Sequence, residues 1–83
     1  MTSKLEQLET AKENYLLTHK GVDVHVYIWS DHVYMKATLE QMGERVNVAQ
    51  WYQLNMDDYT PNEYNKKLED LMDEFISFYE GCR

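Results

Sequence analysis

The chain has 83 residues, of which 43% are hydrophobic and 28% charged, a composition typical of one folded domain over 1–83 and not of a disordered tail. Fifteen acidic and eight basic residues give a formal net charge of −7, which argues against nucleic acid or an anionic membrane as the main partner and leaves a basic protein open. Apolar runs such as 26–29 are too short for a membrane span or a signal-peptide core, so we expect a cytoplasmic protein.

The first predicted element is a helix over about 3–19. Ser3 and Glu6 can form a capping box, and Gly21 is placed to end the helix. The side chains that follow the helical spacing, with one gap, are Leu5, Leu8, Lys12, Tyr15 and Leu16.

The period then changes to two, which predicts three antiparallel strands over about 22–29, 33–40 and 45–54. An even loop after the first strand and a four-residue turn over 41–44 bring aliphatic residues opposite each other. The predicted cross-strand pairs are Val26 with Met35, Ile28 with Val33, Ala37 with Val48, Leu39 with Val46, and the ion pair Glu40 with Arg45.

A second helix is predicted over about 60–80. Thr60 can cap it, Pro61 suits the first turn, Glu63 completes a capping box, and Gly81 can supply the stop. One apolar stripe follows, formed by Tyr64, Leu68, Leu71, Met72, Phe75, Phe78 and Tyr79. We therefore expect an α+β fold, an α-β-β-β-α two-layer sandwich in which both helices cover the aliphatic face of a three-stranded antiparallel meander.

The open face of the sheet is predicted to carry a row of aromatic rings. The register places Tyr27 beside Tyr34 and Tyr34 beside Trp51, with Trp29 at the flank. Such a row can simply stiffen a thin sheet, or it can form a partner or dimer interface, because large exposed apolar patches mark interaction sites.

Some RNA-binding domains stack bases on an aromatic sheet of this kind. The expected element order is similar to that of the double-stranded-RNA-binding domain, whose second helix begins with a lysine cluster. Here Glu63 stands at that place, and Lys66 and Lys67 follow a turn later. Phosphates are bound by lysine and arginine, and Lys36 is the one basic side chain that we expect to be available on this face. The resemblance therefore implies shared topology only.

The acidic excess lies near the C-terminus, where residues 53–83 carry a net charge of −5. The carboxylates that we expect on the outward face of the second helix and the loop before it are Asp57, Asp58, Glu69, Asp70, Asp73, Glu74 and Glu80. They can be a solubilising surface, or they can imitate a phosphate backbone and occupy a basic groove of a partner.

An enzyme is not expected. Phosphate-cradling loops, nucleophile motifs and cysteine pairs are lacking, the spacing of His19, His25 and His32 does not indicate a metal site, and no cofactor is implied. A small open domain also offers little room for a substrate pocket of about 300 Å³ or more.

These observations lead to two hypotheses. The first is a non-enzymatic inhibitor that occludes a basic, nucleic-acid-handling surface of a partner protein. It resembles phage anti-CRISPR and anti-restriction proteins and immunity proteins in size and acidity alone. The alternative is a structural or regulatory homodimer that assembles through the aromatic sheet face.

Overall fold

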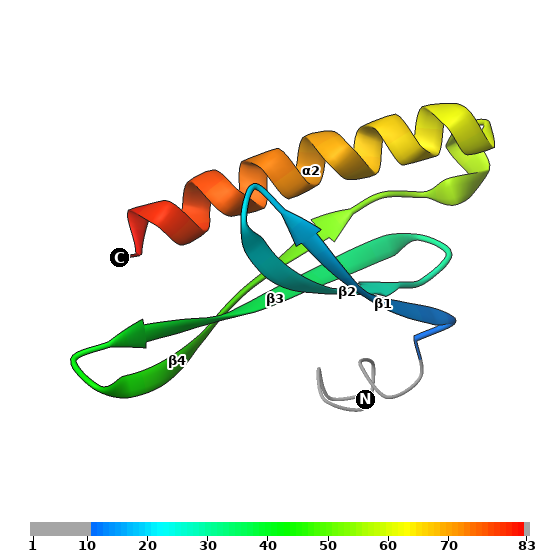
Figure 1. Cartoon of the computed structure of the whole chain (residues 1–83). Helices are drawn as coiled ribbons and strands as arrows, with labels where there is room; N and C mark the ends of the chain where they lie inside the picture. The colour runs from blue at the N-terminus through cyan, green and yellow to red at the C-terminus, as the bar shows by residue number, and fades with distance from the viewer. Residues whose placement is uncertain (1–10, 83) are drawn as a thin grey trace.

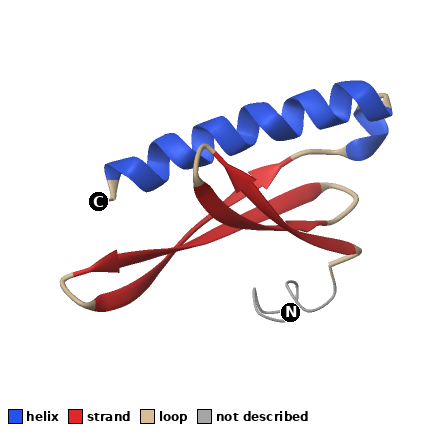
Figure 2. Cartoon of the chain, viewed as in Figure 1, coloured by secondary structure: helices blue, strands red, loops and turns tan. Residues whose placement is uncertain are grey.

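The computed structural model describes residues 11–82, which form a two-layer α+β fold with one sheet and one long helix (Figures 1 and 2). The sheet is an antiparallel meander of four strands in the order β1-β2-β3-β4. A helix lies across one face of this sheet (Figure 1). In chain order the elements are β1 (Glu13–His19), β2 (Val22–Ile28), β3 (His32–Gln41), β4 (Glu44–Gln53), the short 3-10 helix η1 (Met56–Asp58) and α2 (Pro61–Gly81).

The predicted helix over 3–19 is wrong where the structure describes it, because Glu13–His19 is strand β1. Its part before residue 11 lies outside the described residues. All seven residues of β1 pair in register with β2. Helix propensities differ by only ~0.7 kcal/mol per residue among ordinary residues, so this pairing outweighs a weak local helical pattern. The expected sandwich of three strands and two helices is therefore replaced by four strands and one helix.

The turn between β1 and β2 explains the error. Lys20 and Gly21 both have positive φ, 51° and 81°, which is the backbone of a two-residue hairpin turn with right-handed twist. Gly21 was expected to end a helix, and a glycine with positive φ serves either purpose. Lys20 at positive φ carries no sequence signal, so the hairpin could not be recognised.

The central registers of the sheet are confirmed. Ile28 faces Val33, Leu39 faces Val46, and the Glu40–Arg45 pair has an N–O distance of 3.8 Å. The β3–β4 turn is shorter than predicted, because Gln41 and Glu44 already pair and only 42–43 form the turn, with φ of 52° and 80°. The register is unchanged because both loop lengths are even.

The predicted second helix is confirmed as α2. The Thr60 side chain accepts from the Glu63 amide, and the Glu63 carboxylate accepts from the Thr60 amide at 3.2 Å, so both halves of the capping box are present. The core lies between α2 and the aliphatic sheet face and is formed by Val24, Val26, Ile28, Val33, Met35, Ala37, Leu39, Val48, Leu54, Met72, Phe75, Ile76 and Tyr79. Phe78, expected on the buried stripe, is 41% exposed.

Candidate functional site

The open sheet face carries the predicted aromatic residues in the predicted register. Tyr27 pairs with Tyr34, and their ring centroids are 6.2 Å apart with an interplanar angle of 59°. Tyr34 pairs with Trp51, whose side chain is 46% exposed. The Lys36 Nζ atom lies 6.0 Å from the Tyr27 ring centroid, which places a positive charge in cation–π contact with the row.

His32 stacks against two rings of this face, a contact that the sequence did not indicate. Its imidazole lies between two indoles, with centroids 4.4 Å from Trp29 and 4.8 Å from Trp51 and interplanar angles of 14° and 25°. His32 is only 8% exposed, and its Nδ1 lies 2.7 Å from an Asp31 carboxylate oxygen. Its Nε2 is buried without a hydrogen-bond partner. The Trp29–His32–Trp51 stack thus joins the β2–β3 loop to the beginning of β3 and to β4.

The acidic residues of α2 do not form one uninterrupted line. Glu69, Asp70, Glu74 and Glu80 are exposed, as are Asp57 and Asp58 in η1. Between the two groups stand the exposed side chains of Lys66 and Lys67, and the Lys67 Nζ atom lies 6.0 Å from the Tyr59 ring centroid. The carboxylates therefore divide into a group at η1 and a denser group in α2 from Glu69 onward.

Asp73 has a structural role as well as a place in the acidic group. Its Oδ1 atom lies 2.6 Å from His19 Nε2 and 3.1 Å from Lys20 Nζ. Hydrogen bonds from His19 and then from Lys20 lower the pKa of the Asp73 carboxyl below its usual 3.8. Asp73 thereby attaches the β1–β2 turn to α2, which reduces the negative charge available to a partner.

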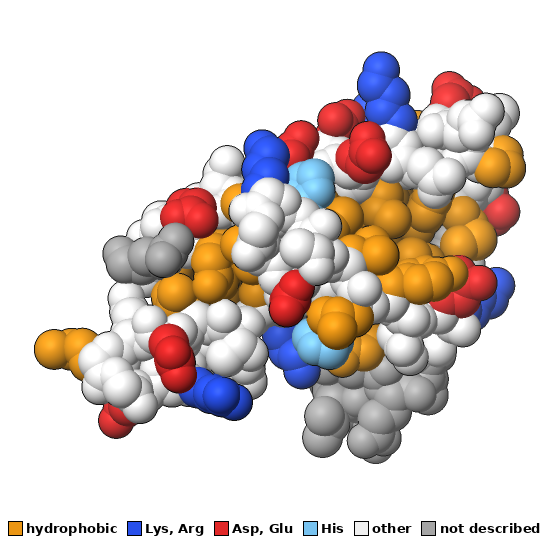
Figure 3. Space-filling model, viewed as in Figure 1, with side chains coloured by type: hydrophobic (Ala, Val, Ile, Leu, Met, Phe, Trp, Pro, Cys, Tyr) orange, Lys and Arg blue, Asp and Glu red, His pale blue; other side chains and the backbone are white. Residues whose placement is uncertain are grey.

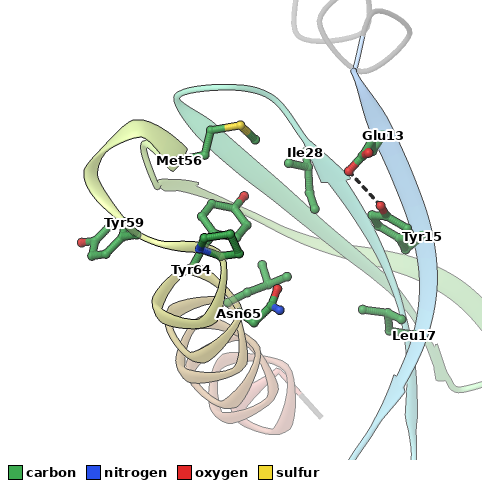
Figure 4. Close-up of a pocket in the computed structure, with 10 residues that line it drawn as sticks. Glu13, Tyr15, Leu17, Ile28, Met56, Tyr59, Tyr64 and Asn65 are labelled. Carbon is green, nitrogen blue, oxygen red and sulfur yellow. Dashed lines mark hydrogen bonds between the residues drawn. The ribbon is translucent and has the colours of Figure 1, made fainter.

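An apolar groove lies between β1 and the first half of α2, and the sequence did not predict it. Its volume is about 470 Å³, within the usual range for small-molecule sites, so the expectation of too little room is wrong. Figure 4 shows Glu13, Tyr15 and Leu17 on the β1 side and Tyr64 and Asn65 on the α2 side. Hydrophobic side chains gather in a band between the charged outer side of α2 and the sheet (Figure 3).

The groove exists because one helix does not cover a four-stranded sheet. A helix with its side chains is about 10 Å across, whereas four strands spaced about 4.8 Å apart span more than that. Tyr15 remains 44% exposed as a result, and Leu17 is only half-buried. The alternation of Tyr15, Leu17 and His19 was the available signal, but it was hidden by Leu16, which points to the open face and is 61% exposed.

A few polar groups line the groove. The Tyr15 hydroxyl donates to a Glu13 carboxylate oxygen at 2.8 Å, and this hydrogen bond raises the pKa of Tyr15. The Tyr64 hydroxyl is buried and has no hydrogen-bond partner among residues 11–82, and burial, with smaller contributions from Glu13 and Tyr15, raises its pKa above 10.0. An unpaired buried hydroxyl costs about 1–3 kcal/mol, so Tyr64 is a costly feature of the free protein.

The described residues hold no cluster of three or more histidine, cysteine, aspartate or glutamate side chains suited to a metal ion. In the same part of the chain, no helix is long and apolar enough to cross a membrane. No protein-family model, curated protein or solved structure matches this chain.

Proposed function

We propose that this protein is a non-enzymatic, protein-binding inhibitor whose acidic surface on α2 occupies a basic, nucleic-acid-handling surface of a partner protein. The observation that supports this proposal is the exposed group of Glu69, Asp70, Glu74 and Glu80, which lies on the side of α2 that the sheet does not use. Asp57 and Asp58 add two carboxylates beside the start of the helix.

The arrangement of these carboxylates opposes helix stability. Asp70 and Glu74 are four residues apart, a like-charge spacing that destabilises a helix by about 0.2–0.5 kcal/mol. The last turn contains no basic residue to interact with the helix dipole. A basic partner would relieve both effects, since it supplies the missing positive charge.

The dimensions suit a phosphate-binding groove. From Glu69 to Glu80 the helix rises about 16 Å at ~1.5 Å per residue, which is comparable to several phosphates along one strand. Complementary charge of this kind mainly accelerates association and selects the partner. In size and acidity the chain resembles phage anti-CRISPR, anti-restriction and immunity proteins, so we place its action in the cytoplasm, or in the host cytoplasm if a phage encodes it.

The proposal is tested with the double variant Asp70→Lys/Glu74→Lys against a panel of purified basic nucleases and polymerases. Association rates are measured at low and high salt, together with displacement of a labelled 20-base-pair duplex from each enzyme. We expect wild type to bind at least one enzyme and displace the duplex, and the variant to associate about tenfold more slowly at low salt.

The matched control is Glu40→Lys/Glu44→Lys, which changes the net charge equally at the β3–β4 hairpin, on two exposed residues that are not part of the proposed acidic surface. Asp73 is left intact because it holds His19 and Lys20. Equal slowing by both double variants would show that net charge alone acts and would refute a defined acidic site. Absence of binding across the panel would refute the proposed class of partner.

The aromatic face supports a second candidate, a homodimer assembled through the open side of the sheet. The Trp29–His32–Trp51 stack holds two indoles on this side of the sheet, and Trp51 is 46% exposed, as expected of an interface anchor. Sedimentation of wild type, Trp51→Ala and the control Phe78→Ala tests it, since Phe78 is an exposed aromatic residue of α2. A monomer at millimolar concentration, or equal dissociation by both variants, would exclude this dimer.

A further inference from the structure

The groove between β1 and α2 has the properties of a ligand site that is independent of both proposed interaction surfaces. Its walls come from strands β1 and β2, from η1 and from α2, and the apolar side chains that form them include Leu17, Ile28, Met56 and Leu68. Apolar walls of this kind favour a hydrocarbon or aromatic body over water.

The negative charge at the groove favours a positively charged ligand. Glu13 is its one charged lining residue, and no lysine, arginine or histidine is among the described residues that line it. The Glu13 carboxylate accepts one hydrogen bond, from Tyr15, and a carboxylate has about four acceptor positions. It can therefore accept from a cation without losing the Tyr15 contact.

Tyr64 adds a second feature that the ligand should match, which is a hydrogen-bonding group. Its hydroxyl is buried and has no partner, although it lies on the groove opposite Glu13 and Tyr15 (Figure 4). A hydroxyl can donate and accept, so a ligand N–H group that displaces the side chains covering this hydroxyl could donate to it. The rings of Tyr15 and Tyr64 also offer faces that attract cations. Tyr59 is less available because Lys67 already lies over its ring at 6.0 Å.

We propose that this groove binds a small apolar amine, with its hydrocarbon body between Leu17, Ile28 and Leu68 and its ammonium group at Glu13 and Tyr64. A carboxylate ligand is disfavoured because it would meet Glu13, and a purely apolar ligand would leave the Tyr64 hydroxyl unpaired. The proposal does not depend on the acidic surface of α2, so either can fail alone.

The test compares three ligands of similar size: 2-phenylethylammonium, 2-phenylethanol and 3-phenylpropanoate. Each is titrated into the full chain at pH 7 and constant ionic strength, and backbone amide shifts are followed by NMR. A hydrogen bond to a charged group is stronger than one between neutral groups, so we expect the amine to bind about tenfold more tightly than the alcohol. The carboxylate is expected to bind more weakly still.

Two variants locate the ammonium group. Glu13→Gln keeps the shape of the side chain and should abolish the preference for the amine over the alcohol while leaving alcohol binding unchanged. Glu44→Gln, at the start of β4, is the matched control and should behave as wild type. Tyr64→Phe should weaken the amine several-fold and affect the alcohol less. Thermal unfolding of each variant shows that the fold is retained.

The expected shifts lie at residues 13–17 and 64–68. Equal binding of the amine and the alcohol, retention of the amine preference in Glu13→Gln, or shifts confined to the Trp29–His32–Trp51 stack would each overturn the proposal. The absence of any amide shift at about 10 mM amine would overturn it as well, because even a weak site with a millimolar Kd is substantially occupied at that concentration.

Discussion

Removal of the Tyr64 hydroxyl should stabilise this protein, although Tyr64 packs against the core. The hydroxyl is buried and has no hydrogen-bond partner, so the folded state bears a desolvation cost that the unfolded chain does not. This cost is about 1–3 kcal/mol. Tyr64→Phe keeps the ring and its packing, and we expect the free energy of unfolding to rise by at least about 1 kcal/mol.

The expected change is readily measurable. For a domain of this size, 1 kcal/mol shifts Tm by about 4–8 °C, so circular dichroism melts and urea titrations should both detect the variant. The control is Tyr52→Phe, because Tyr52 is half-buried and its hydroxyl is not among the buried unpaired atoms. We expect little change for that variant.

The dependence on pH provides a second measurement of the same group. Burial raises the pKa of Tyr64 above 10.0, so the folded state favours the neutral phenol and the unfolded state ionises first. Ionisation of Tyr64 therefore does not affect stability below pH 10, and it destabilises the folded state as pH rises through the folded pKa. Tyr64→Phe should lose less stability between about pH 10 and 12 than wild type.

A lower Tm for Tyr64→Phe than for Tyr52→Phe would refute this reasoning, because it would mean that the Tyr64 hydroxyl makes a favourable contact in the folded protein. If the amine site exists, a saturating amine should reduce the advantage of Tyr64→Phe, since the ligand then pairs with the hydroxyl only in wild type.

Two further predictions concern the turns. The pKa of Asp73 is lowered by His19 and Lys20, so the contribution of Asp73 to stability is present above pH 3.8 and is lost as pH falls through the folded pKa. Asp73→Asn should remove this acid-dependent part in urea titrations at pH 2 to 6. A constant difference from wild type across that range would contradict the prediction. In the β3–β4 turn, Met42 is fully exposed with φ of 52°, so Met42→Asn should stabilise the hairpin by about 0.5–1 kcal/mol. Gly43→Ala, at φ of 80°, should destabilise it by about 1–2 kcal/mol. Thermal melts that give both variants the same sign would contradict the assigned turn.

The period-two pattern of the central strands was sufficient to predict their pairing. Val26, Ile28, Val33 and Met35 alternate with polar and aromatic residues, and a shift of one residue would expose all of them. The α2 helix was equally clear, because Thr60 and Glu63 report a capping box locally. These features depend on neighbours in the chain, and for that reason they can be recognised in the sequence.

The features that escaped prediction depend on residues far apart in the chain or on backbone geometry without a side-chain signal. Lys20 adopts a positive φ in the hairpin turn after β1, and no sequence pattern marked this turn, so a helix was predicted where β1 lies. His19 and Asp73 meet across 54 residues, and this contact occupies a carboxylate that was expected to face a partner. His32 lies between the indoles of Trp29 and Trp51, which come from the β2–β3 loop and from β4, and this stacking has no local sequence signal.

The acidity of α2, the aromatic side of the sheet and the registers of its central strands follow from local composition and period, so they can be read from the amino-acid sequence. That a single helix faces four strands depends on long-range packing and is seen only in the folded protein. This arrangement leaves the groove beside β1, because the width of one helix cannot cover the sheet, and Glu13, Tyr15 and Tyr64 line that groove.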